Sequence, residues 1–570
     1  GTTGYDFLNQ VNGIFVDRAR RKAFAKIYRD FIGMEINFRN LVNSTKKMTM
    51  LISLASDVNS LGHQLDRISE RNRHYRDFTL NSLTFAIREV IACLSVYRTY
   101  TNGTTGAVSE RDEKYVEAAV AEAKRRNPRT ARALFDFVRD TLLLRNLRHF
   151  REEDRPQAID FVMDIQQLTG PVMAKAVEDT AFYVYNRLTS LNEVGGDPER
   201  FGVSPEDFHR QNSERLRLWP HSMLATSTHD TKRSEDVRAR ISILSEIPVE
   251  WRAALMRWSG LNAAKKSEVE GALAPDRNEE YLLYQTLVGA WPVPSPGPEE
   301  LNDFRERITA YMQKAIKEAK VHTSWVNPNE PYDQAVTNFV RDVLDPGAEN
   351  EFLRDFARFH ARIAYPGMLN SLSQTLLKIT SPGVPDFYQG TELWDFSLVD
   401  PDNRRPVDFE ERRRLLEKLQ RAEAEDPVAL VNDLLAHWQD GRVKLYLIYK
   451  SLNFRRSQKL LLQEGEYIPL YASGKGKENL CAFARRRGGA WIVTVAPRLI
   501  TRLVGPESPP LGKEIWGDGA LALPQEAPAL WSNVLTGKNL QTSGSERKKF
   551  LDLGSVFQDF PLALLTSGRV

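Results

Sequence analysis

The chain has 570 residues, of which 42% are hydrophobic and 27% are charged, as is usual for a globular protein. Its 78 lysine and arginine residues nearly balance its 75 aspartate and glutamate residues, which leaves a net charge of +3. This balance argues against a nucleic-acid or membrane partner, because such partners need a basic excess on one face.

Length and cysteine usage set further bounds. A chain of this length predicts roughly three or four domains. Cys93 and Cys481 stand far apart in apolar surroundings, which excludes a disulfide framework or zinc-finger spacing and indicates a reducing cytoplasm. The sequence contains no run of 18 apolar residues and no signal peptide. It starts at Gly1, without Met and inside what looks like a motif, so we expect a fragment of a longer chain.

The first part of the chain is predicted to be mainly helical. Residues 1–15 are glycine-rich and then aromatic, which is typical of a barrel strand end or loop. Residues 16–168 show helical spacing, as at Leu61, Leu65 and Ile68, and predict an all-helical insertion domain, in which Ser109 is a predicted N-cap. Residues 170–183 leave two interpretations open: an amphipathic helix with Glu178 and Asp179 in solvent, or a strand end that faces a ligand.

The most informative stretch runs from Met223 to Arg233. A short apolar run passes into polar residues that include His229 and Asp230, and residues 234–241 then read as a helix. In a (β/α)8 barrel, catalytic side chains lie at such strand-to-loop ends. A simpler interpretation is that Asp230 or Ser234 only caps the following helix.

A second element of this kind follows a helix predicted over residues 367–380. Residues 381–383 form a turn, residues 384–389 predict a buried strand, and residues 390–394 are its polar and aromatic end. Two such repeats predict an α/β fold with barrel strands and helices over residues 169–454, interrupted by a helical insertion around 240–345. Short β-type runs between glycine-rich turns predict a C-terminal antiparallel β domain over residues 455–570.

The chemistry is indicated by what these strand ends carry. The sequence has no phosphate-binding loop, dinucleotide fingerprint, HExxH or Gly-x-Ser-x-Gly motif. Carboxylates that can bind vicinal hydroxyls and aromatic rings that can cover a sugar face together favour a carbohydrate site. The candidates are Asp6, Glu178, Asp179, Asp230, Glu392, Tyr5, Tyr183, Tyr388 and Trp394.

These motifs resemble those of the maltooligosyltrehalose synthases, a branch of the α-amylase-type glycoside hydrolases. The stretches 229–233 and 381–392 are similar to barrel strands seven and eight of that type, and the stretches 1–7, 170–183, 191–197 and 398–405 match the synthase pattern. The resemblance covers essentially all 570 residues. It implies the C-terminal part of a (β/α)8 TIM barrel that lacks the first five strands, with a large helical insertion and the β domain.

The resemblance also implies an enzyme, a (1→4)-α-D-glucan 1-α-D-glucosylmutase of trehalose biosynthesis. Such an enzyme converts the reducing-end α-1,4 linkage of a maltodextrin into an α,α-1,1 linkage by intramolecular transglucosylation. An Asp attacks the anomeric carbon, a Glu protonates the leaving glucose, and that glucose then attacks the glycosyl-enzyme through its own anomeric hydroxyl. The site must exclude water, because water would give hydrolysis instead.

The nucleophile and the acid of the family lie in strand-four and strand-five motifs, which match no segment here. We therefore expect the chain alone to be inactive and prone to aggregate. Asp230 matches the third carboxylate, which binds ring hydroxyls and favours the oxocarbenium-like state, and His229 matches its neighbouring hydroxyl ligand. The other predicted substrate ligands form two groups. Each member of the first could instead be a surface ion-pair partner or a core aromatic: Lys175, Glu178, Tyr183, Lys232 and Arg233. The second comprises Tyr388, Glu392, Tyr5 and Asp6, of which Asp6 could equally cap a helix.

The expected partners are a maltooligosaccharide substrate, the missing N-terminal barrel half and a trehalose-releasing hydrolase that acts on the product. No cofactor and no metal is expected, and the location implied is cytoplasmic. Two alternatives stay open. The chain could be a non-catalytic maltodextrin-binding module or one half of a split enzyme, or, less favoured, an α-amylase-type hydrolase.

Overall fold

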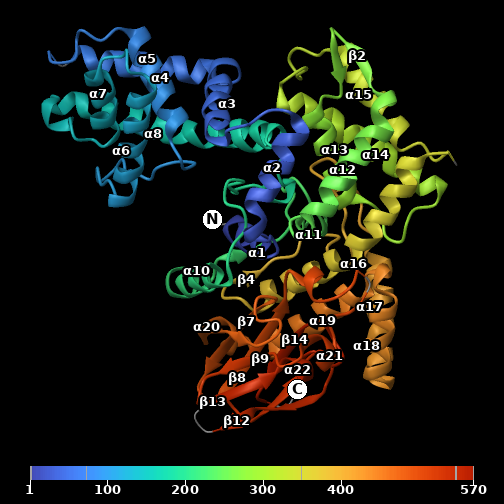
Figure 1. Ribbon diagram of the computed structural model, residues 1–570. Coiled ribbons are helices and arrows are strands. Elements are labelled where there is room, and N and C mark those ends of the chain that lie inside the picture. Colours follow the sequence, from blue (N-terminus) through green and yellow to red (C-terminus); the bar gives the residue numbers. More distant parts are fainter. Residues whose placement is uncertain (1–2, 72, 348, 507, 546–547, 569–570) are drawn as a thin grey trace. The chain divides into compact units, whose positions relative to one another are not determined.

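A computed structural model describes residues 3–71, 73–347, 349–506, 508–545 and 548–568. Gly1 and Thr2, which open the N-terminal motif, lie outside the described residues. The chain divides into two compact units (Figure 1). Unit 1 comprises Gly1–Met34, Asn186–Lys317 and Val326–Val570, and unit 2 comprises Glu35–Tyr185 and Glu318–Trp325.

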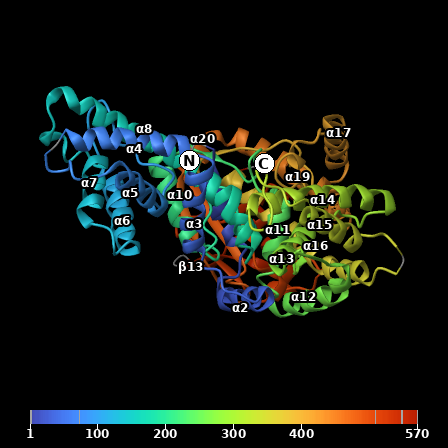
Figure 2. The ribbon, with the colours of Figure 1, turned by 90° about the horizontal axis from the view of Figure 1, so that it is seen from above.

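Unit 2 is helical throughout its described secondary structure, and α4 to α8 form a bundle in it (Figure 2). The predicted helical spacing of Leu61, Leu65 and Ile68 is confirmed, since all are buried in the core of this bundle. Ser109 caps α6, as its hydroxyl accepts a hydrogen bond from the backbone N–H of Asp112. The elements are α3 (Phe38–Ile52), α4 (Ala55–Glu70), α5 (Leu80–Cys93), α6 (Glu110–Arg126), α7 (Arg132–Leu142), η2 (Leu147–His149), η3 (Glu152–Asp154), α8 (Arg155–Met173), η4 (Ala174–Ala181) and α9 (Phe182–Val184).

Residues 170–183 form a continuous helix, so the interpretation as a ligand-facing strand end is wrong. The α-helix α8 passes into η4, a π-helix, and then into α9. The wider turn is visible at Thr180, whose hydroxyl donates to the backbone carbonyl of Lys175, five residues earlier, over 3.0 Å. Buried residues recur along η4 at Ala176, Val177 and Ala181, which is a helical pattern rather than the alternation of a strand. Single-turn π segments are frequent at functional sites.

Unit 1 contains the remaining helices, a parallel strand pair and antiparallel sheets. Its helices are α1 (Tyr5–Ile14), α2 (Arg21–Ile32), α10 (Pro205–Leu218), α11 (Glu235–Ile243), α12 (Pro248–Asn262), α13 (Arg277–Ala290), α14 (Pro298–Ala319, to Lys317 in this unit), α15 (Glu330–Val343), α16 (Glu351–Thr380), α17 (Phe409–Glu425), α18 (Pro427–Ala436), α19 (Arg442–Ser457), α20 (Lys459–Glu464), α21 (Gly512–Trp516) and α22 (Leu553–Val556). Short 3-10 turns are η1 (Arg18–Arg20), η5 (Thr189–Leu191), η6 (Ala263–Lys265), η7 (Asp402–Arg404), η8 (Trp438–Asp440) and η9 (Ile500–Arg502). Within this unit α11 packs against both α13 and α16 (Figure 2).

The N-terminal segment is a helix, α1, and not the strand or loop predicted for residues 1–15. Gly4 precedes it with a φ of +86°, and a Cβ there would lie 2.5 Å from the backbone N of Ala225. Phe7, Val11 and Ile14 then recur at helical spacing and are buried together with Leu224 and Leu377 in one core cluster. The glycines favoured a loop in the sequence, but the period of the apolar residues is helical.

The strands β1 (Met223–Leu224) and β4 (Val384–Pro385) pair in parallel, with Met223 opposite Val384. The predicted order of strand, polar end and helix after β1 is confirmed by α11. The strand predicted over 384–389 is shorter than expected and is not buried, since the side chain of Val384 is exposed. The last backbone hydrogen bond between the segments runs from Asp386 N to Leu224 O, over 3.0 Å. Since parallel strands end at the same edge, the polar residues after β1 and β4 are neighbours.

The C-terminal residues form two antiparallel sheets, drawn in orange and red in Figure 1. One has the strand order β11-β10-β14-β8-β7-β5 and the other the order β12-β13-β9-β6. The side chains of Trp491, Trp516 and Trp531 are buried in their shared core. Their strands are β5 (Glu466–Leu470), β6 (Ala472–Ser473), β7 (Leu480–Arg487), β8 (Ala490–Pro497), β9 (Ala520–Leu523), β10 (Leu530–Asn533), β11 (Asn539–Gln541), β12 (Ser543–Ser545), β13 (Lys548–Asp552) and β14 (Ala563–Thr566), while β2 (Ser267–Val269) and β3 (Ala272–Ala274) form a separate hairpin.

Among the described residues, no helix is both long enough and apolar enough to cross a membrane.

Candidate functional site

His229 and Asp230 lie in a tight turn directly after β1. Their side chains are 58% and 59% exposed, with His229 Nε2 3.3 Å from Asp230 Oδ2. Thr228 closes the turn, because its hydroxyl accepts from Asp230 N at 3.1 Å and its carbonyl accepts from the hydroxyl of Thr231 at 2.9 Å. The turn therefore presents an imidazole and a carboxylate together to solvent.

The interpretation of Asp230 or Ser234 as a helix cap is wrong. Ser234 occupies the N-cap position of α11, but its side chain makes no capping hydrogen bond and donates to the backbone carbonyl of Asp395. Asp230 lies before the N-cap residue, in the turn closed by Thr228. The carboxylate of Asp230 is thus available for a role other than holding the helix start.

Two of the predicted aromatic ligands converge on the same turn. The hydroxyl of Tyr5, at the start of α1, lies 3.1 Å from the hydroxyl of Thr228. The hydroxyl of Tyr388 donates to the carbonyl of Asn403 at 3.1 Å, and the side-chain amide of Asn403 donates to the carbonyl of His229 at 3.0 Å. The fold thus brings Tyr5, His229, Asp230 and Tyr388 into one site. Asn403 was missed by the sequence analysis, because its role as a clamp depends on the return of residues 398–405 to the end of β1.

Lys232 and Arg233 follow the turn but lie inside unit 1. Their backbone N–H groups donate to the buried carboxylate of Glu193, at 2.8 and 3.2 Å. The guanidinium of Arg233 is buried and donates to the carbonyl of Thr189 at 3.3 Å and to the hydroxyl of Tyr311 at 2.8 Å. A sugar hydroxyl would have to displace one of these contacts to reach it.

Glu392 and Asp6 also belong to unit 1. Glu392 accepts a hydrogen bond from Arg412 Nε at 2.9 Å and from the backbone N–H of Gly390 at 3.1 Å, so it is an ion-pair partner that shapes the loop after β4. Asp6 is exposed in the first turn of α1, where a carboxylate stabilises the helix N-terminus.

The remaining predicted ligands belong to unit 2. Lys175 is exposed and forms an ion pair with Asp179 over 2.9 Å along η4. Glu178 is buried and accepts a hydrogen bond from the hydroxyl of Tyr97. Tyr183 is buried in the same segment. Lys175 thus has an acidic partner and Glu178 a phenolic partner, both within this unit.

No family model matches the sequence. Two Mycobacterium tuberculosis proteins, from strains CDC 1551 and H37Rv and provisionally named maltooligosyl trehalose synthase, are each 38% identical to this chain over 401 residues. The structure of a maltooligosyltrehalose synthase from Arthrobacter ramosus matches with a TM-score of 0.77 at 32% identity and covers 99% of this chain. The chain is a homologue of maltooligosyltrehalose synthases. A hypothetical maltooligosyl trehalose synthase from Sulfolobus tokodaii matches with a TM-score of 0.69 at 30% identity, again over 99% of this chain.

The coverage of these synthases by the chain is partial. The 401 matched residues are 70% of this chain but 45% of each Mycobacterium tuberculosis protein. The chain covers 63% of the Arthrobacter ramosus synthase and 62% of the Sulfolobus tokodaii protein. It therefore spans about half the length of the curated synthases that it resembles.

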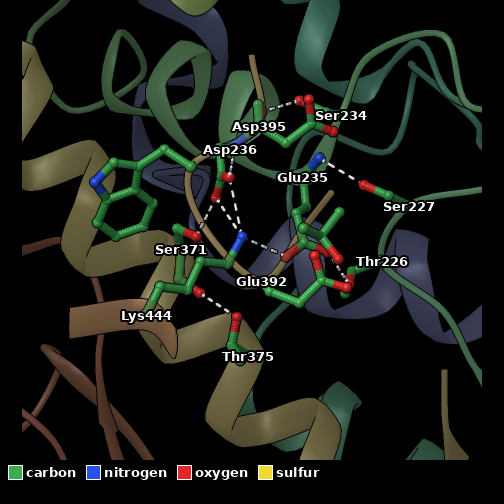
Figure 3. A network of polar contacts seen from close by, with 12 residues as sticks. Thr226, Ser227, Ser234, Glu235, Asp236, Ser371, Thr375, Glu392, Asp395 and Lys444 are labelled. Carbon is green, nitrogen blue, oxygen red and sulfur yellow. Dashed lines mark hydrogen bonds and ion pairs between the residues drawn. The ribbon is translucent and has the colours of Figure 1, made fainter. Parts of the chain in front are cut away.

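Beneath the turn lies a network of buried charges that the sequence analysis missed (Figure 3). Glu235 and Asp236, which open α11, face Lys378 of α16 and Lys444 of α19, and all four side chains are at most 2% exposed. Burial acts to raise the pKa of Glu235, but Lys378 and Lys444 outweigh it and lower that pKa to about 2. Burial raises the pKa of Asp236, against the attraction of Lys444. The sequence gives no sign of this burial, because acidic residues such as Glu235 and Asp236 are common in the first turn of any helix.

The carboxylates around the turn are held by cations of the chain itself. Glu193 faces Arg238 at 3.3 Å, Glu235 faces Lys444 at 2.8 Å, and Glu392 faces Arg412 at 2.9 Å. These pairings make them structural ion pairs rather than a ligand set for a metal ion. The carboxylate of Asp230 differs from them, since it is 59% exposed and lies beside the imidazole of His229 rather than a lysine or arginine among the described contacts.

Proposed function

We propose that this chain acts in the intramolecular transglucosylation of maltodextrins, with the turn of His229 and Asp230 as part of its sugar site. The observation that carries the proposal is the match to the Arthrobacter ramosus synthase, at 32% identity over 99% of this chain. The site supports it independently. An exposed carboxylate beside an imidazole, flanked by Tyr5 and Tyr388, is suited to sugar hydroxyls and to the apolar face of a sugar ring.

We also propose that β1 and β4 correspond to barrel strands seven and eight of an α-amylase-type barrel. Their parallel pairing, and the tight polar turn that follows β1, are what such strands require. The side chains of Met223 and Val384 are exposed on this pair, although strands of a closed barrel are covered. Further strands would cover them. On this proposal the nucleophile Asp and the acid Glu belong to strand motifs that match no segment of these 570 residues.

The reaction breaks the bond between the anomeric carbon of the penultimate glucose and O4 of the reducing-end glucose. It forms a bond from the same carbon to O1 of the released glucose, so the mass is unchanged and the reducing end disappears. A carboxylate at Asp230 accepts hydrogen bonds from ring hydroxyls, and this interaction strengthens as the sugar ring gains positive charge. Lys175 and Glu178 remain proposed ligands of the released glucose.

The test compares two purified proteins with maltopentaose as substrate, followed by reducing ends and free glucose. One is this chain, and the other is a chimera that places the strand-four and strand-five motif region of a Mycobacterium tuberculosis relative upstream of it. We expect no reaction with the chain alone and a loss of reducing ends without glucose with the chimera. The chimera with Asp230→Asn should lose at least 100-fold in rate, as is typical when a charge-stabilising group is removed. Asp303→Asn, at an exposed position of α14, is the matched control.

Other outcomes identify the alternatives. Free glucose in proportion to the lost maltopentaose would favour an α-amylase-type hydrolase. Binding of maltopentaose without any reaction of the chimera would favour a non-catalytic binding module. If the transglucosylation is observed, its product carries a terminal trehalose unit. The reaction that consumes this product is then hydrolysis of the next α-1,4 bond, which is the proposed partner activity.

A further inference from the structure

Lys444 is at the centre of the buried network in Figure 3. Its Nζ atom lies 2.8 Å from Glu235 Oε1, 3.0 Å from Asp236 Oδ1 and 2.9 Å from Asp236 Oδ2. The side chains of Lys444 and Glu235 are completely buried, and that of Asp236 is 2% exposed. Buried charges of this kind persist only when they are paired and hydrogen-bonded, so each acid depends on the amine of Lys444.

Glu235 links Lys444 to the segment after β1, and these contacts are the first arm of the network. Its carboxylate accepts a hydrogen bond from the hydroxyl of Thr226, and its backbone N–H donates to the hydroxyl of Ser227 at 2.9 Å. Lys378 donates to the same Thr226 hydroxyl at 2.7 Å. Thr226 and Ser227 lead directly into the turn of His229 and Asp230, so Glu235 fixes where that turn begins.

Asp236 carries the second arm, toward the loop after β4. Its Oδ2 atom accepts from the backbone N–H of Asp395 at 2.7 Å. The same loop is tied again where the backbone N–H of Ser234 donates to the carbonyl of Ser397, at 3.0 Å. Further along, it brings Asn403 to the carbonyl of His229 at 3.0 Å. The second arm therefore reaches the same turn from the opposite strand.

We propose that Lys444 is a positioning residue of the sugar site, because it holds together the two acids whose contacts fix both strand-end loops. Lys444 does not touch the turn itself and acts through Glu235 and Asp236. That the ligand of the site is a maltodextrin rests on the proposed function, whereas the positioning of the loops does not.

The test is a double variant, Lys444→Met with Asp236→Asn. It removes one positive and one negative charge, so Glu235 and Lys378 remain as a neutral pair, 3.7 Å apart. Lys444→Met alone would leave two buried carboxylates facing each other and could fail to fold. The matched control is Lys450→Met with Glu423→Gln, which removes the ion pair between Lys450 of α19 and Glu423 of α17, whose side chains are 20% and 19% exposed.

The first readout is amide hydrogen exchange of the ligand-free full chain, followed by mass spectrometry. We expect peptides that cover residues 224–232 and 386–398 to exchange about tenfold faster in the double variant and unchanged in the control. Unchanged exchange in both segments would overturn the inference. Faster exchange in only one segment would also overturn it, because the two loops would then be held independently. Lys444→Gln with Asp236→Asn replaces the methionine variant if that does not fold, with the same expectation.

The second readout is the dissociation constant for maltopentaose, measured by calorimetry. We expect it to rise about tenfold in the double variant, whereas a residue that served stability alone would leave it unchanged in the folded protein. Unchanged affinity in a variant with faster exchange would overturn the role in the sugar site. If neither the wild-type chain nor the chimera binds maltopentaose, the proposed function is contradicted, and hydrogen exchange still decides whether Lys444 positions the loops.

Discussion

Replacing Glu193 by alanine should destabilise unit 1 strongly. The carboxylate of Glu193 is fully buried and accepts hydrogen bonds from the backbone N–H groups of Val194, Lys232 and Arg233, at 2.9, 2.8 and 3.2 Å. It also lies 3.3 Å from the guanidinium of Arg238, which is itself buried. The alanine variant leaves that cation without this partner and leaves the three donors unsatisfied.

The magnitude follows from these contacts. Removing one partner of a buried ion pair costs about 3–5 kcal/mol, and an unsatisfied buried donor costs about 1–3 kcal/mol. These contributions overlap, because a single water molecule entering the space of the carboxylate can serve several donors. Arg238 also keeps its donation to the backbone carbonyls of Thr226 and Arg233. We therefore expect a loss of about 4 kcal/mol in the free energy of unfolding.

The assay is urea denaturation followed by circular dichroism and by tryptophan fluorescence, with the transition of unit 1 fitted separately. The control is Glu417→Ala at an exposed position of α17, which should stay within about 0.5 kcal/mol of the wild type. A loss below about 1 kcal/mol for Glu193→Ala would refute the reasoning. It would mean that the backbone of Lys232 and Arg233 is held by other contacts.

Three further predictions concern the site and its surroundings. Asp230→Asn should weaken maltopentaose binding about tenfold in calorimetry without lowering the melting temperature, since the side chain is 59% exposed. A lower melting temperature would assign Asp230 a structural role. Asn403→Ala removes the donor to the His229 carbonyl and should weaken maltopentaose binding several-fold, with a stability loss of about 1 kcal/mol. Wild-type affinity in this variant would exclude Asn403 as a clamp of the turn. Burial raises the pKa of Glu246 to about 7, from an ordinary 4.5, although Thr501 hydrogen-bonds to it. Between these two values the native state keeps a proton that the unfolded state loses, so the free energy of unfolding should fall by about 3 kcal/mol as the pH rises from 4.5 through 7. Glu246→Gln should flatten this pH dependence in denaturation curves measured across that range.

Much of the local structure could be predicted from the sequence, because it depends on near neighbours. The spacing of Leu61, Leu65 and Ile68 was enough to place a helix, and the run from Met223 into polar residues was enough to place β1 before α11. The exposure of His229 and Asp230 at the strand end also agrees with the predicted position. Each of these features is decided within a window of a few residues.

The features that the sequence did not reveal depend on contacts between distant segments. The glycines before α1 favour a strand end or loop in the local pattern, whereas the conformation of this segment is set by packing against β1 and α16. The burial of Glu235 and Asp236 requires Lys378 and Lys444, which are far away in the chain. Asn403 reaches His229 only because the loop after β4 returns to the end of β1. A single sequence does not display such pairings.

The measurement that tests the central proposal most directly is a crossover experiment with the chimera. A mixture of unlabelled and uniformly 13C-labelled maltopentaose is converted, and the non-reducing product is analysed by mass spectrometry. Intramolecular transfer predicts products of only the two original masses, with an α,α-1,1 linkage seen by NMR. Products of intermediate mass, or fragments that have gained water, would show transfer between molecules or hydrolysis and would contradict the proposal.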